Sequence, residues 1–204
     1  MDDSAIYRIA QRFAGLSAEQ RQAVYQRVLA EGMTAGQFPV TPRAPAASRD
    51  GGQPLSYAQS RQWFLWELEG GGSAYHITGA LRLQGKLDMA AVRESFGAIV
   101  ARHEALRTVF RANAEGLAEQ WVMESGAFQF SEIDLTGSAD AEAEAGRVAR
   151  ELGETPFELG TGPLLRVGLL RLAAGEHVLV VVMHHIVSDG WSVQLIVDEF
   201  TAQY

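Results

Sequence analysis

The sequence has no cysteine, no long apolar run and no excess of positive charge. Without cysteine there is no disulfide framework and no thiol nucleophile. No stretch approaches the ~18 uninterrupted apolar residues of a membrane span, and no basic segment followed by an apolar core marks a secretory signal. We therefore expect a cytoplasmic protein without a membrane partner.

Acidic residues outnumber basic residues, 25 to 17, which gives a formal net charge of −8. Nucleic-acid binding needs clustered lysine and arginine to displace counterions, so the charge argues against a nucleic-acid partner. Of the 204 residues, 47% are hydrophobic and 21% are charged, which is an ordinary globular composition. The chain is long enough for one sizeable core and a small appendage.

The chain is predicted to contain three segments: a helical segment over 1–38, a linker over 39–53 and a main lobe over 54–204. Ser17 and Gln20 have the spacing of a capping box, and apolar residues follow at helical spacing. The first segment is therefore predicted to be a helical hairpin, which either packs on the main lobe or docks an upstream protein or domain. The second segment is rich in proline and glycine, which is typical of a linker.

Helical and strand patterns alternate along the main lobe. Apolar residues recur at helical spacing in some segments, and they alternate or run continuously in others, as strands do. The alternation predicts an α/β fold in which helices cover a mixed sheet. Helices are expected over 57–68, 139–152 and 191–204 and after Asp88, and strands over 75–84, 106–111, 118–123, 128–133, 164–172 and 177–183.

The most informative segment is HHIVSDG, residues 184–190. The β-branched run 178–183 before it is typical of a strand buried on both faces, and the residues after it have an apolar helical face. The motif is therefore predicted to be a loop between a core strand and a helix. Such a loop holds an imidazole rigidly and exposes one ring nitrogen, and Gly190 allows close backbone approach or a positive φ.

Adjacent histidines in a strand point to opposite faces, so one of the pair is expected to face the structure and the other a substrate. We select His185 for the chemistry and leave His184 as its neighbour. The pair could instead simply pack at the strand end, or bind a metal with Asp189. No metal is expected, because the remaining histidines follow no ligand spacing and cysteine is absent. We expect Asp189 to pair with an arginine and hold the loop.

The HHxxxDG pattern resembles that of the chloramphenicol-acetyltransferase-like superfamily, which includes the condensation, epimerisation and cyclisation domains of nonribosomal peptide synthetases. Two further segments resemble the first and second core motifs of condensation domains: LSYAQSRQWFL at 55–65 and RHEALRTVF at 102–110. All three segments occur in the order of that family and roughly at its spacing. The chain is thus similar to a condensation domain over residues 53–204, in the fold of its N-terminal lobe.

The resemblance implies an acyltransferase that forms peptide bonds. In this family a donor acyl group arrives as a thioester on the phosphopantetheine arm of a carrier protein, and the amine of a second carrier-bound aminoacyl group attacks it. The domain itself is implied to bind no cofactor. His185 would then be a general base, an orienter of the amine or a stabiliser of the intermediate. The backbone N–H of Gly190 is a candidate oxyanion donor, because it lies at a helix entrance.

The motifs supply further candidate site residues. The catalytic candidates are His185, His184, Asp189 and Gly190. The candidate partners of Asp189 are Arg61, the first choice, and then Arg102 and Arg107. Trp63, Trp191 and Ser188 are candidates for the core or for the wall of a substrate tunnel.

A complete condensation domain is similar to two such lobes in tandem, with the reaction in a tunnel between them. The expected partners are therefore a C-terminal lobe, donor and acceptor peptidyl carrier proteins and a downstream adenylation domain, in antibiotic or siderophore biosynthesis. We expect the 204 residues alone to be inactive. The alternatives are a stand-alone HHxxxDG acyltransferase that uses a soluble acyl thioester, an epimerisation domain and a non-catalytic docking lobe.

Overall fold

The computed structural model describes residues 8, 12–13, 16–32, 51–124 and 126–204. The chain divides into two units, Met1–Ser48 and Arg49–Tyr204. In the first unit, helix α2 (Ala18–Ala30) begins with a capping box: Gln20 donates its backbone N–H to Ser17 Oγ at 3.2 Å, and Ser17 donates its own to Gln20 Oε1 at 3.1 Å. Most of the remaining predicted hairpin, and linker residues 39–50, lie outside the described residues.

A four-stranded mixed sheet forms the centre of the second unit, with the strand order β2-β7-β6-β5. The strands are β2 (His76–Gln84), β5 (Gln129–Asp134), β6 (Leu165–Ala173) and β7 (Glu176–His184). Strand β7 is antiparallel to both of its neighbours, and β5 pairs with β6 in parallel. Most residues of β7 are buried, which confirms the strand predicted from its continuous apolar run.

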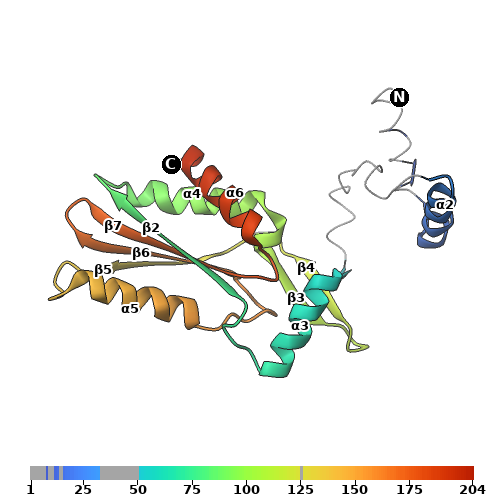
Figure 1. The fold of residues 1–204 in the computed structure, drawn as a ribbon, viewed down its shortest axis with the longest axis horizontal. Coiled ribbons are helices and arrows are strands. Elements are labelled where there is room, and N and C mark those ends of the chain that lie inside the picture. Colours follow the sequence, from blue (N-terminus) through green and yellow to red (C-terminus); the bar gives the residue numbers. More distant parts are fainter. Residues whose placement is uncertain (1–7, 9–11, 14–15, 33–50, 125) are drawn as a thin grey trace. The chain divides into compact units, whose positions relative to one another are not determined.

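Helices cover both faces of this sheet, as Figure 1 shows. Helices α4 (Met89–Arg102) and α6 (Gly190–Gln203) share one apolar cluster with the sheet, and α5 (Ala141–Glu154) contributes to a second cluster on the other face. Because β5 and β6 are parallel, the chain needs a crossover between them, and α5 provides it. Asp88 caps α4 as predicted and accepts the Ala91 N–H at 3.1 Å.

A smaller sheet has the order β1-β4-β3, and helix α3 precedes its longer strands in the chain. The elements are β1 (Gln53–Pro54), α3 (Tyr57–Glu69), β3 (Thr108–Ala112) and β4 (Ala118–Val122). Gln53, placed by the sequence at the end of the linker, pairs with Gln120 of β4 instead. Backbone pairing therefore extends the second unit slightly further toward the N-terminus than predicted.

The strand predicted over 106–111 begins only at Thr108. The preceding Glu104–Arg107 forms a 3-10 helix, and Thr108 donates its hydroxyl to the Glu104 carbonyl at 2.7 Å. The overall arrangement, a mixed sheet between helical layers, confirms the predicted α/β class. Among the described residues, no helix is long and apolar enough to cross a membrane.

Candidate active site

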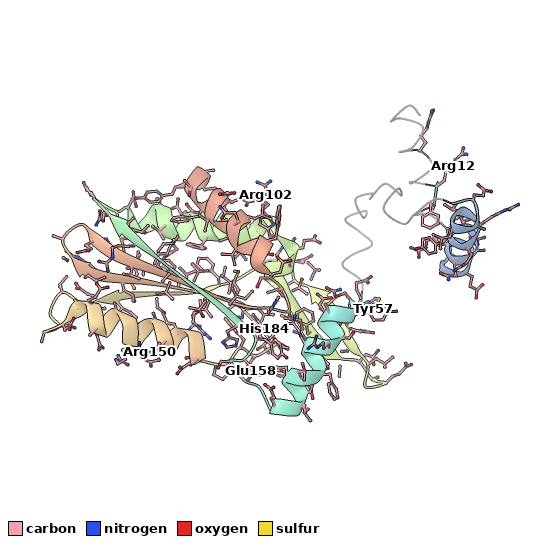
Figure 2. All side chains as sticks on the ribbon, viewed as in Figure 1. Arg12, Tyr57, Arg102, Arg150, Glu158 and His184 are labelled. Atoms are coloured by element: carbon pink, nitrogen blue, oxygen red, sulfur yellow. The ribbon has the colours of Figure 1, made fainter. Side chains whose placement is uncertain are left out.

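The HHIVSDG segment lies where strand β7 ends and helix α6 begins. His184 is the last residue of β7, and Asp189 is the N-cap of α6, so the segment is a tight connection between a core strand and a helix. Figure 2 labels His184 at the end of the sheet toward helix α3. This placement agrees with the strand, loop and helix predicted from the sequence.

The His184 ring is buried, with 1% of the residue exposed. Its Nδ1 accepts the Ile186 N–H at 3.1 Å, and its Nε2 has no hydrogen-bond partner among the described residues. Burial first, and then the neighbouring His76 and His185, lower the pKa of His184 to about 4. A neutral, enclosed imidazole of this kind supports the loop from within the core.

His185 has the opposite environment, because it is exposed in the loop. Its Nδ1 lies 2.6 Å from the Ser188 carbonyl oxygen. A carbonyl can only accept, so Nδ1 carries a proton, and in the neutral ring the lone pair is then on Nε2. The His185 backbone N–H is donated to the Tyr75 carbonyl at 2.8 Å. The Nδ1 bond orients the exposed ring and the backbone bond fixes the loop that carries it, so Nε2 of the neutral ring is open to accept a proton or a hydrogen bond.

Asp189 caps helix α6 and does not pair with an arginine in the described part of the chain. Its Oδ1 accepts the Ser192 N–H at 2.8 Å and the Ser192 hydroxyl at 2.6 Å, and Asp189 donates its own N–H to Ser192 Oγ at 3.2 Å. These bonds, first that from the Ser192 side chain, hold the pKa of the Asp189 carboxyl below its ordinary value. The Asp189 carboxylate therefore orders the start of helix α6. It does so through a residue three positions away, and not through the arginine that was expected from the sequence.

The three arginines predicted as partners of Asp189 lie elsewhere in the second unit. Arg102 is 3.7 Å from Glu199, and Arg107 contacts Glu104 at 3.3 Å and donates to the Met123 carbonyl. Arg61 is exposed on α3 and makes no ion pair with a described residue. The predicted ion pair of Asp189 is therefore not found among the described residues, and the backbone and hydroxyl of Ser192 bond to Asp189 Oδ1 instead.

Gly190 begins α6 with an exposed backbone. Its φ is not positive, and no described atom lies within 4 Å of the place that a Cβ would occupy. Neither of the steric reasons predicted for this glycine therefore applies within the described residues. The open space leaves the Gly190 amide accessible at the positive end of the helix dipole, whereas Asp189 accepts the N–H groups of Ser192 and Val193.

The other sequence candidates divide between core and surface. Trp63 packs against the second apolar cluster, 5.6 Å from the Trp66 ring, and Trp191 is 78% exposed beside the loop. Ser188 is buried and donates its hydroxyl to the His184 carbonyl at 3.0 Å. A small apolar groove of about 120 Å³ runs between β2, β7 and α6 and reaches Met183 and Val193 on either side of the loop.

Helix α3 supplies contacts that the sequence analysis did not find. Gln62 donates its amide to the His185 carbonyl at 3.4 Å, and Gln59, one turn earlier, donates to the Ile186 carbonyl at 3.5 Å. The first motif thus holds the backbone of the third motif. Among the described residues, no group of three His, Cys, Asp or Glu side chains is placed to bind a metal.

Comparison with known proteins identifies this architecture. The family model of the condensation domain matches residues 50–204. The chain is 40% identical to the phosphinothricin tripeptide synthetase PhsC of Streptomyces viridochromogenes over 193 residues, which cover 94% of this chain and 17% of the synthetase. It is also 40% identical to the malpinin synthetase of Mortierella alpina over 157 residues, 77% of this chain and 2% of that protein.

Solved structures agree with this result. The starter condensation domain of rhizomide synthetase RzmA is similar with a TM-score of 0.69 and 26% identity, over 74% of this chain and 36% of that one. The first condensation domain of the CDA synthetase is similar with a TM-score of 0.67 and 26% identity, over 74% of this chain and 39% of that one. The chain thus spans little more than a third of these solved domains. It belongs to the condensation-domain family of nonribosomal peptide synthetases.

Proposed function

We propose that this chain provides the histidine-bearing half of a site that forms peptide bonds between two carrier-bound substrates. The supporting observation is the exposed His185 ring at the end of the core strand, whose Nδ1 bonds to the Ser188 carbonyl and whose Nε2 is therefore the acceptor of the neutral ring. An amine nitrogen attacks the thioester carbonyl carbon, the carbon–sulfur bond breaks and a thiol leaves. The proton released from the amine passes to His185 Nε2 and then to the departing sulfur.

The reaction does not require His185 to be a strong base. An α-amino group has a pKa near ~8, so about a tenth of it is neutral at pH 7 and can attack without first losing a proton to the enzyme. The larger demands are the alignment of two tethered reactants and the stabilisation of the tetrahedral oxyanion. At the start of α6 the Gly190 backbone N–H lies at the positive end of the helix dipole, which suits a donor to the oxyanion.

The proposed partners follow from the length of the related domains. Because the chain spans 36% of the solved rhizomide domain, we propose that a second lobe completes the tunnel and that peptidyl carrier proteins deliver donor and acceptor from its two sides. Their phosphopantetheine arms carry the substrates, and the domain needs no cofactor of its own. Residues 1–204 alone should not condense substrates, because the His185 loop is open to water on this lobe.

The test is single-turnover dipeptide formation between two loaded carriers, catalysed by the synthetase that contains this domain. His185→Ala should lower the rate by on the order of 10²-fold or more. His185→Asn is the matched variant, because it retains a donor for the Ser188 carbonyl and lacks the outer ring atoms, Nε2 among them. If both variants condense at the wild-type rate, the proposal is wrong.

The same assay separates the alternatives. A stand-alone acyltransferase would use soluble acyl thioesters as readily as carrier-bound ones. An epimerisation domain would invert the donor without joining it to an acceptor. A docking lobe would leave condensation unchanged when His185 is substituted.

A further inference from the structure

Two histidines on adjacent strands each keep one buried ring nitrogen without a hydrogen-bond partner among the described residues. His76 and His184 are direct partners in the β2–β7 register, and their ring centroids lie 5.7 Å apart at an interplanar angle of 67°. The unpaired atoms are Nε2 of His76 and Nε2 of His184. An unpaired buried polar atom costs free energy, so two of them on neighbouring rings require an explanation.

The backbone fixes the tautomer of each ring. His76 Nδ1 lies 2.7 Å from the Gly153 carbonyl oxygen, which can only accept, so Nδ1 carries the proton and Nε2 is a bare acceptor. His184 Nδ1 accepts the Ile186 N–H, so the proton of the neutral ring is on Nε2. One unpaired atom is therefore an acceptor and the other is a donor.

The surroundings keep both rings neutral. Burial is the main cause that lowers the pKa of each ring. The Arg166 guanidinium lies 4.3 Å over the Phe157 ring, and the His76 ring meets the same phenyl ring at 4.8 Å, so a positive charge lies behind His76. Among the described histidines only His103 forms an ion pair, with Glu199. No described carboxylate therefore compensates a proton on either ring of the pair.

The pair is connected to His185 through short hydrogen bonds. Tyr75, which precedes His76, accepts the His185 N–H at 2.8 Å. The His184 carbonyl accepts the Ser188 hydroxyl at 3.0 Å, and the Ser188 carbonyl accepts the His185 Nδ1–H at 2.6 Å. A displacement of His76 or His184 is therefore transmitted to both hydrogen bonds that orient His185.

We propose that His76 is a positioning residue for His185. Its Nε2 accepts the Nε2–H of His184 through one bridging water, because the two atoms make no direct hydrogen bond, and this contact holds the loop in the geometry that condensation needs. The effect on activity rests on the proposed function, whereas the pairing of the two rings does not.

Two substitutions at His76 separate this role from simple packing. His76→Asn keeps a donor near the Gly153 carbonyl and loses the acceptor for His184. His76→Gln places an amide oxygen near the former Nε2 and loses the donor to Gly153. We expect His76→Asn to lower kcat of carrier-dependent condensation about tenfold with KM within about twofold, and His76→Gln to stay within about threefold of wild type. Any other order, equal losses included, would overturn the proposal.

A second measurement does not depend on activity. In wild-type protein with 15N-labelled histidine, the ring nitrogen shifts at pH 7 should place the proton of His76 on Nδ1 and that of His184 on Nε2. The opposite tautomers, or a charged ring at this pH, would overturn the pairing. If these tautomers are found but the wild-type synthetase does not condense, the proposed function fails and the pairing stands.

Discussion

The Arg166 guanidinium lies over the Phe157 ring, with 4.3 Å between its Cζ and the ring centroid, and it is buried without a carboxylate partner in the described part of the chain. Carbonyl and amide oxygens satisfy it instead. They are those of Gln129 at 2.8 Å, Leu152 at 2.6 Å, Thr155 at 3.0 Å and Pro156 at 3.3 Å. Arg166 therefore joins strand β6 to β5, to the end of helix α5 and to the residues that follow this helix.

Arg166→Lys should destabilise the fold by about 3 kcal/mol, because an ammonium cannot donate to all four oxygens and remains a buried cation. Urea unfolding measures the loss. Arg147→Lys is the matched control, since Arg147 is exposed on α5 and pairs there with Glu144 and Glu151. Its effect should stay within ~0.5 kcal/mol. Equal midpoints for the two variants would contradict the role given to Arg166.

Stability should fall in mild acid because His184 is neutral in the fold. Its pKa is lowered from 6.5 to about 4, so the unfolded chain takes up a proton first as the pH falls. The stabilising contribution is complete above pH ~6.5 and is lost as the pH falls toward ~4. Between pH 7.5 and pH 5 this one group should lower the free energy of unfolding by about 2 kcal/mol.

His184→Asn isolates this contribution, because asparagine has an acceptor for the Ile186 N–H and does not titrate. Urea unfolding at pH 7.5, 6.5, 5.5 and 5 should give a flatter pH dependence for the variant than for wild type. If the free energy of unfolding falls equally with pH in the variant and in wild type, protonation of His184 is not the cause of the loss of stability in acid.

Asp189 should matter to stability as a helix cap. Asp189→Ala removes the acceptor for both Ser192 donors and should lower the melting temperature by roughly 2–4 °C. Asp189→Asn retains an acceptor oxygen of equal capping strength and should melt close to wild type. Thermal unfolding followed by circular dichroism distinguishes the two variants. A loss in Asp189→Asn as large as in Asp189→Ala would show that the charge itself is needed.

Features set by near neighbours in the chain could be predicted from the sequence. The apolar run 178–183 predicts a core strand, and Ser17 and Asp88 begin helices as expected. Each of these signals depends on hydrogen bonds or burial within one element. The motif at 184–190 also predicts its own position between β7 and α6.

Contacts between distant segments could not be predicted in this way. The pairing of His76 with His184 depends on the register of two strands far apart in the sequence. An arginine was also predicted as the partner of Asp189. In the structure Ser192, three residues away, bonds to Asp189 Oδ1, and a partner so near in the chain costs less conformational entropy to bring into place. A local cap therefore replaced the predicted long-range ion pair.

Gln62 should influence condensation, because it carries the contact from helix α3 to the backbone of His185. Its amide nitrogen donates to the His185 carbonyl at 3.4 Å, and its Oε1 is buried without a partner among the described residues. Reversing the amide would point oxygen at oxygen, so the observed orientation is the one that the carbonyl requires.

Gln62→Met removes the donor and also the unpaired oxygen at nearly constant volume. The lost hydrogen bond is long, so we expect only about a threefold fall in kcat. Gln62→Glu keeps the shape but directs a carboxylate oxygen at the His185 carbonyl, so its loss should be larger, about tenfold or more. Single-turnover condensation with both carriers saturating measures these rates, and thermal unfolding checks that each variant is folded. If Gln62→Glu is as active as wild type, helix α3 does not position His185 through this residue.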